Sequence, residues 1–287
     1  MEQLLSTIRS YAGYNTSQSL KIEYRSVSSE IRRTPQNINI SLTPNRVAGF
    51  LGAITLLLIA ASVGLLIADY FTGYSSMIIH KLVKLFNLDL EVNVPTFFSV
   101  LLLTSASALL AVVTFNRFKQ RLSQRYLWAI LSLGFLFMAF DEMASVHERL
   151  IEPTREIMGI ENLGLFYYAW VIPAFGLIAV LGLAYLKFLI DLPKPTRFYF
   201  LLAATMFLGG AVGLELLEGV YGTGTLMYNI FVTCEEALEM GGVIVLIWSL
   251  LGFIGNSSRD AGVKFDLSRH DALSDKNWTI RELGVQS

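Results

Sequence analysis

Long apolar runs alternate with short polar connections along most of the chain. Six of these runs approach or exceed the roughly 20 apolar residues that a helix needs to cross a bilayer. We therefore predict an all-α integral membrane protein with six transmembrane helices in one membrane domain, residues 45–254. The predicted spans are 47–70, 96–116, 126–147, 165–187, 197–218 and 228–254.

The basic residues predict the orientation of these helices. Of the 22 Lys and Arg residues, four (Lys81, Lys84, Arg149 and Arg155) fall on one side of the predicted membrane, and the rest fall on the other side. Lys and Arg accumulate in cytoplasmic loops. We therefore expect both termini in the cytoplasm (N-in/C-in) and a multi-pass location in the cell (inner or plasma) membrane.

Three segments outside the spans have their own patterns. Residues 1–44 form a polar, cytoplasmic N-terminal segment whose two alternating stretches fit either a small hairpin or an extended tail. Residues 255–287 form a polar cytoplasmic tail. In the outer connection, 74–87, apolar and polar positions separate at helical spacing, which predicts a short interfacial helix.

Composition narrows the classes of protein and of site. The chain is 54% hydrophobic and 16% charged, whereas soluble domains are about 25% charged. Its net charge of −1 gives no electrostatic basis for a nucleic-acid partner. The single cysteine, Cys234, excludes an intrachain disulfide and a cysteine-rich metal site. The predicted partner is the lipid bilayer itself, and the sequence identifies no protein partner.

Nine ionisable side chains fall within or at the ends of three apolar runs. A charged side chain at membrane depth costs a few kcal/mol or more, so such residues usually face a protein interior or a water-filled cavity. Helix rise places all nine in one layer, about 20–32 Å from the cytoplasmic edge. The third, fifth and sixth spans should therefore meet there. The nine residues are Asp141, Glu142, His147, Glu148, Glu215, Glu218, Glu235, Glu236 and Glu239.

Carboxylates crowded in this layer need either protons or a bound cation. We expect a divalent metal ion, because carboxylates suit Mg²⁺, Ca²⁺ and Mn²⁺, and an imidazole admits Zn²⁺ or Fe. Glu142 or His147 is then the candidate general base. The candidate metal ligands are Asp141, Glu148, Glu215, Glu218, Glu235, Glu236 and Glu239.

Helical spacing adds two expectations about this layer. Asp141, Ser145 and Glu148 should form one polar stripe on the third span. Glu148 and Glu218 have an alternative interpretation, in which each only ends its helix in the outer headgroup water.

Small residues predict how two of these spans meet. Gly209, Gly210 and Gly213 on the fifth span, and Gly241 and Gly242 on the sixth, form surfaces that let helices approach closely. They should hold the two spans together just below the acidic layer.

Three functions are compatible with these features. The leading hypothesis is a metal-dependent membrane hydrolase that acts on a small or lipid-linked extracytoplasmic substrate. One alternative is an ion- or proton-coupled transporter or ion pathway, in which the carboxylates relay cations. Another is a non-catalytic sensor or assembly factor. The sequence does not decide between them.

Three motifs carry a resemblance to known sequences. They are DEMASVHE (141–148), GLELLEG (213–219) and EEALEMGG (235–242). The combination resembles a recurrent pattern in uncharacterised bacterial polytopic membrane proteins, and it covers the third to sixth spans. The resemblance implies a shared site, and no activity comes with it.

Overall fold

The computed structural model describes residues 43–159 and 164–260, with side chains up to residue 256. This part of the chain is helical and contains no strand. In chain order its elements are α2 (Pro44–Phe71), α3 (Met77–Phe86), α4 (Val94–Lys119), α5 (Arg125–Ala144), η1 (Glu148–Leu150), α6 (Ile151–Met158), η2 (Gly164–Phe166), α7 (Val171–Asp191), α8 (Lys194–Leu208), η3 (Gly209–Leu214), α9 (Glu215–Glu218) and α10 (Leu226–Asp260).

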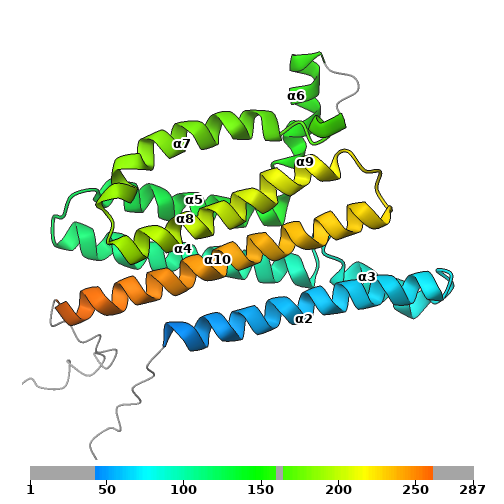
Figure 1. The fold of residues 1–287 in the computed structure, drawn as a ribbon, viewed down its shortest axis with the longest axis horizontal. Coiled ribbons are helices and arrows are strands. Elements are labelled where there is room, and N and C mark those ends of the chain that lie inside the picture. The colour runs from blue at the N-terminus through cyan, green and yellow to red at the C-terminus, as the bar shows by residue number, and fades with distance from the viewer. Residues whose placement is uncertain (1–42, 160–163, 261–287) are drawn as a thin grey trace, which may run out of the picture. The chain divides into compact units, whose positions relative to one another are not determined.

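The six predicted spans are confirmed. Six helices in the described part are long and apolar enough to cross a membrane: α2, α4, α5, α7, the continuous run Lys194–Glu218, and α10 as far as Asn256. Their axes run roughly alongside one another (Figure 1). The predicted N-terminal and C-terminal segments, 1–44 and 255–287, lie almost entirely outside the described residues.

Two span boundaries differ from the sequence-based prediction. The third span ends at Ala144, because Ser145 adopts a left-handed conformation with φ 48° and stops the helix. The expected polar stripe of Asp141, Ser145 and Glu148 on one helix is therefore wrong. The fourth span begins at Val171 instead of 165, because a 3₁₀ turn, η2, precedes it.

Tight packing fills the end of the bundle opposite the acidic layer. Trp128 of α5 is fully buried, and its ring contacts those of Phe188 on α7 and Phe253 on α10, with centroids 4.9 and 5.4 Å away. The guanidinium of Arg117 lies 5.5 Å from the centre of the Trp128 ring. Aromatic contacts of this kind stabilise a core beyond the area they bury. This cluster ties α5, α7 and α10 together.

A reciprocal serine pair joins α4 to α5. The Ser107 hydroxyl donates to the Ser132 carbonyl at 2.8 Å, and the Ser132 hydroxyl donates to the Ser107 carbonyl at 2.9 Å. Both side chains are buried. In an apolar surrounding, such bonds between helices contribute about 0.6–2 kcal/mol each.

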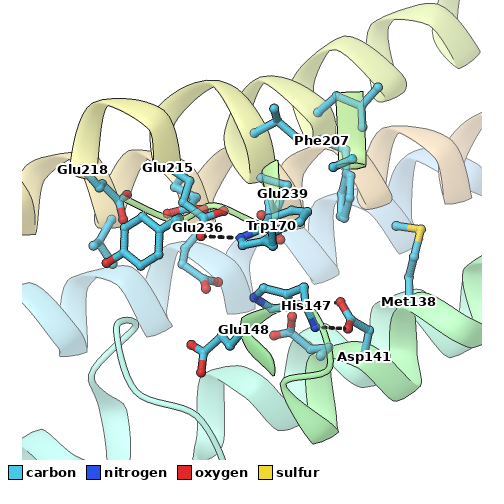
Figure 2. A pocket seen from close by; sticks show the side chains of 18 of the residues that line it. Met138, Asp141, His147, Glu148, Trp170, Phe207, Glu215, Glu218, Glu236 and Glu239 are labelled. Atoms are coloured by element: carbon cyan, nitrogen blue, oxygen red, sulfur yellow. Dashed lines mark hydrogen bonds and ion pairs between the residues drawn. The ribbon is translucent and has the colours of Figure 1, made fainter. Parts of the chain in front are cut away.

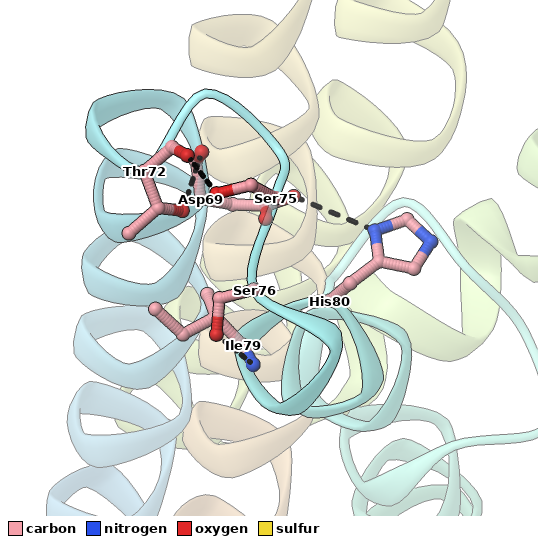
Figure 3. Close-up of polar contacts among 6 residues, drawn as sticks. All are labelled: Asp69, Thr72, Ser75, Ser76, Ile79 and His80. Atoms are coloured by element: carbon pink, nitrogen blue, oxygen red, sulfur yellow. Dashed lines mark hydrogen bonds and ion pairs between the residues drawn. The ribbon is translucent and has the colours of Figure 1, made fainter.

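The short helix predicted within 74–87 is confirmed as α3, and it is held to the end of α2 (Figure 3). The Thr72 hydroxyl donates to the Asp69 carbonyl at 3.0 Å, and the Ser76 side chain caps α3 by accepting from the Ile79 amide. His80 Nδ1 lies 3.6 Å from a carboxylate oxygen of the buried Asp69. These contacts fix the turn that leads toward α4.

Three of the five glycines expected to join the fifth and sixth spans do so. A Cβ added at Gly242 of α10 would lie 2.9 Å from both the Ala203 carbonyl oxygen and the Phe207 amide nitrogen of α8. Gly210 and Gly241 are similarly crowded, whereas a Cβ at Gly209 or Gly213 would meet nothing within 4 Å. Close backbone approach therefore depends on Gly242, which faces the α8 backbone, and on Gly210 of η3, which faces the α10 backbone. A Cβ at Gly241 would meet only the flexible end of the Met206 side chain.

This contact generates a stability prediction. Gly242→Ala should destabilise the protein by about 1–3 kcal/mol, because the added methyl group overlaps the α8 backbone, which cannot move as a flexible side chain would. Thermal unfolding in detergent measures the change. Gly252→Ala is the matched control on the same helix, since a Cβ there meets nothing within 4 Å. Equal melting temperatures for the two variants would contradict the packing argument.

Candidate functional site

All nine ionisable residues singled out from the sequence line the same cavity, which has a volume of about 470 Å³ (Figure 2). They reach it from α5, from the turn that follows α5, and from α9 and α10. The prediction that the third, fifth and sixth spans meet at these residues is therefore confirmed. The catalytic and ligand roles predicted for the individual residues remain predictions.

A π-helical segment positions the two acids of the fifth span. η3 comprises Gly209–Leu214, and the short helix α9 that follows carries Glu215 and Glu218. Its wider turn shifts the helical phase, and π-helical turns are frequent at functional sites. Glu215 is 7% exposed and Glu218 is 4% exposed. Glu218 is thus a cavity residue and does not end its helix in headgroup water.

The helix α10 contributes three carboxyl groups, from Glu235, Glu236 and Glu239, which are half-buried and line the cavity. Close packing behind them fixes their position, since a Cβ at Gly210 would lie 2.8 Å from the Glu235 carbonyl oxygen. These groups are held by a tightly packed pair of helices.

The turn after α5 brings a histidine back onto an aspartate of that helix. The His147 amide donates to Asp141 Oδ1 at 2.9 Å, and His147 Nδ1 lies 2.9 Å from Asp141 Oδ2. One carboxylate thus holds both the backbone and the ring of His147 (Figure 2). With Nδ1 bonded to Asp141, Nε2 is the ring nitrogen left for chemistry.

An aromatic side chain supports both the histidine and a deeper acid. The Trp170 ring packs against the His147 ring with centroids 4.9 Å apart. Its Nε1–H donates to Glu215 Oε1 at 2.7 Å. Trp170 therefore links the turn after α5 to α9.

Sequence reasoning missed two acids in this cavity, Asp89 and Glu91. Both lie in the connection between α3 and α4 and line the cavity. Asp89 accepts a hydrogen bond of 2.6 Å from the Tyr228 hydroxyl, which lies 3.3 Å from the Tyr168 hydroxyl. Their position just outside the second span, at the depth of the acidic layer, was the available signal.

The groups that lie outside the spans have perturbed acidities. Burial raises the pKa of Asp89, against the lowering effect of the Tyr228 hydrogen bond. Burial and then the charge of Glu148 raise the pKa of Glu91. Burial alone would lower the pKa of His147, but the hydrogen bond and charge of Asp141 outweigh it and raise that pKa. The pKa shift therefore favours the protonated form of His147.

Within the described residues, Glu91, His147 and Glu148 form a group with metal-ligand geometry. Each offers one ligand atom, and these atoms all lie within 4.8 Å of one another. Glu148 is exposed, whereas the other two are half-buried. Over 43–159 and 164–260, no comparable group of three forms among the deeper acids predicted as ligands.

Nearly all the ionisable groups around the cavity are acidic. Ten carboxyl groups line it together with His147, and no Lys or Arg is among the lining residues. In a low-dielectric surrounding, carboxylates without counter-charges are costly. The cavity is therefore suited to cations.

Fold and site together define the class: a multi-pass membrane protein with a carboxylate-lined cavity at one end of its helical bundle. The chain belongs to the family described as Domain of unknown function (DUF8692), which matches residues 50–253. That match covers every span and all the acids of the cavity. No curated protein and no solved structure matches the chain.

Proposed function

We propose that this protein is a metal-dependent membrane hydrolase, whose divalent ion is held by Glu91, His147 and Glu148 at the outer end of the cavity. The observation that supports this most strongly is the hydrogen-bonded pair of Asp141 and His147 beside two further carboxylates. Metal-binding histidines usually donate their other ring N–H to a carboxylate, which fixes the ring and raises its basicity.

The set of ligands formed by Glu91, His147 and Glu148 suits a catalytic metal ion. Three protein ligands leave a position open for water or substrate, as in catalytic zinc sites. The three ligand atoms lie within 4.8 Å of one another, and they would have to converge to lie about 2.0–2.2 Å from a shared ion. One imidazole and two carboxylates suit Zn²⁺ or Mn²⁺.

The proposed roles differ from those predicted from the sequence. His147 becomes a ligand, and Asp141 orients it. Glu91 joins the ligand set, and Glu148 keeps its predicted role. The deeper acids Glu215, Glu218, Glu235, Glu236 and Glu239 line the rest of the cavity and are not ligands.

Glu142 is the remaining candidate for the general base. It lies on α5 next to Asp141 and lines the cavity. A divalent ion held by Glu91, His147 and Glu148 would supply a water of lowered pKa, and the Glu142 carboxylate would accept the proton of that water.

The basic residues support an extracytoplasmic site in the cell membrane. Arg117, Lys119, Arg125 and Lys194 lie at the ends of spans remote from the cavity. Since Lys and Arg accumulate in cytoplasmic loops, the cavity opens to the outside and both termini are cytoplasmic.

Packing weighs against the transporter alternative. A transporter needs a polar route through the bundle, whereas Trp128, Phe188 and Leu250, each at most 1% exposed, fill its inner end. A sensor or assembly factor would use the two terminal segments, which lie outside the described residues.

The first prediction from this proposal concerns metal content. Purified protein should bind one Zn²⁺ or Mn²⁺ ion per chain, measured by elemental analysis and calorimetry. Glu91→Gln and His147→Gln should abolish binding, because each removes a ligand. Asp141→Asn should weaken it by about 10–100-fold, the effect of losing a group that orients a ligand.

Two controls make this measurement decisive. Glu152→Gln removes an exposed acid paired only with Arg155, and should bind metal normally. Glu215→Gln should also retain the metal, which separates the proposed ligand set from the one predicted from the sequence. Wild-type protein that binds no divalent metal would refute the proposal.

A second prediction concerns catalysis. Glu142→Gln should retain the metal but lose about 10²–10⁴-fold in hydrolysis, the contribution of a general base. The assay incubates metal-loaded protein with total membrane lipid and water-soluble esters, and mass spectrometry follows hydrolysis products. Full activity in this variant would exclude Glu142 as the base.

A third prediction tests the orientation. In a Cys234→Ser background, Glu156→Cys on the exposed face of α6 should react with a membrane-impermeant maleimide in intact cells. Gln120→Cys, exposed at the opposite end of the bundle, should react only after the membrane is opened. The reverse pattern would show that the cavity opens to the cytoplasmic side of the membrane.

A further inference from the structure

The cavity has two chemically different ends. Its outer end is lined by carboxyl groups, and a second region is apolar. In Figure 2, Met138 and Phe207 lie on the opposite side of the cavity from Glu218. The apolar region is formed by Leu103, Met138, Phe207, Leu208, Ala211 and Val212, together with one face of α7.

The α7 face is a continuous apolar stripe. Ala174, Leu177, Ile178 and Leu181 all line the cavity. Their spacing of i, i+3, i+4 and i+7 places them on one side of the helix. The stripe is about 10 Å long, by the rise of an α-helix. It therefore extends the cavity from the acidic layer into the apolar depth of the bundle.

The helix α7 is fixed near both ends but not in between. Just before its outer end, Trp170 donates to Glu215 at 2.7 Å. Near its inner end, the Tyr185 hydroxyl donates to the Leu127 carbonyl at 2.8 Å, and the Phe188 ring contacts Trp128. Between these points α7 arches away from the helices beside it (Figure 1). The middle of α7 lines the cavity there.

The apolar region is open at its side. Leu177 and Leu181 line the cavity and are nevertheless 59% and 42% exposed. In a bilayer, the surface exposed at this depth of a spanning helix faces acyl chains and not water. The opening therefore leads from the lipid into the acidic layer.

We propose that the cavity binds an amphiphile with a protonated amine head group, whose alkyl chain enters from the bilayer beside the middle of α7. The chain lies along the Ala174–Leu181 stripe, and the ammonium lies among the carboxyl groups of α9 and α10. This inference rests on the proposed function, because it names the class of molecule that occupies the same cavity.

Charge and hydrogen bonding select the head group. Ten carboxyl groups and no Lys or Arg line the cavity, which disfavours a phosphate or sulfate and favours a cation. An ammonium offers three donors and no acceptor. The Glu218 carboxyl group interacts with that of Glu235, but its Oε1 is a buried atom in the cavity wall with no hydrogen-bond partner in the described residues. An amine donor there would satisfy it.

The size of the cavity suits one such molecule. A volume of about 470 Å³ lies within the range of roughly 300–1,000 Å³ typical of small-molecule sites. The apolar stripe accepts the chain, and the side opening leaves the remainder of a longer chain in the bilayer.

Photolabelling of the full chain in lipid nanodiscs tests this inference. The probe is a long-chain primary amine with a diazirine in its chain, compared with an alcohol and a phosphate monoester of the same chain. The amine should label the cavity face of α7 together with Met138 and Phe207, as mapped by mass spectrometry. The phosphate should label them about tenfold less, the effect of a modest difference in affinity.

Paired variants separate specific binding from general contact with lipid. Leu181→Trp fills the apolar stripe and should reduce amine labelling about tenfold. Leu183→Trp, on the lipid-facing side of α7 at 76% exposure, should leave labelling unchanged. Ala174→Phe fills the same stripe and replaces Leu181→Trp if that variant does not fold. Glu218→Gln should reduce labelling by the amine but not by the alcohol.

Labelling spread evenly over all spans, equal labelling of Leu181→Trp and Leu183→Trp, or equal labelling by amine and phosphate would each overturn the inference. The experiment is run in the presence of a chelator. Labelling without metal binding in the separate elemental analysis would refute the metal-dependent function and leave this inference standing. Metal binding without specific labelling would support the metal-dependent function and overturn this inference.

Discussion

The cost of placing carboxyl groups at membrane depth without basic partners constrains the whole molecule. Ten carboxyl groups line one cavity, seven of them on spanning helices, and no Lys or Arg does so. A buried charge in an apolar medium is tolerated only when it is paired, hydrogen-bonded or neutralised. The fold meets this requirement with a few protein hydrogen bonds, from Trp170 to Glu215 and from Tyr228 to Asp89. The remaining carboxyl groups need protons or cations that the protein itself does not supply.

The rest of the bundle keeps this arrangement rigid. Aromatic packing around Trp128 closes the inner end, and glycine contacts hold α8 against α10. The π-helical segment η3 then sets the direction of Glu215 and Glu218. Because these supports surround the acids on one side only, α7 can stand apart along its middle without loosening the carboxylate layer. The packed helices α8 and α10 thus hold the acids in place, whereas access from the bilayer lies beside α7.

The sequence predicted the six spans and the shared acidic layer because both follow from simple regularities, apolar length and helix rise. It failed where the backbone leaves the ideal helix. Ser145 in a left-handed conformation turns His147 back onto Asp141, and no spacing rule anticipates that contact. Glu91 was missed because it lies in a connecting loop, whose path depends on the contacts of α3 and α4. The burial of Glu218 likewise depends on the turn of η3.

The two proposals divide the negative charge of the cavity between two cations of different kinds. Glu91, His147 and Glu148 come from connecting segments at the outer end, where a hydrated metal ion can exchange with water. Glu215, Glu218 and Glu235 come from packed helices in the same cavity as the apolar region, so that an ammonium can reach them while its alkyl chain lies along α7. A metal ion demands convergent ligand atoms, which the outer group has and the deeper acids lack. An ammonium on a flexible chain needs only nearby acceptors, which the deeper acids provide. The geometry of each group therefore matches the cation assigned to it.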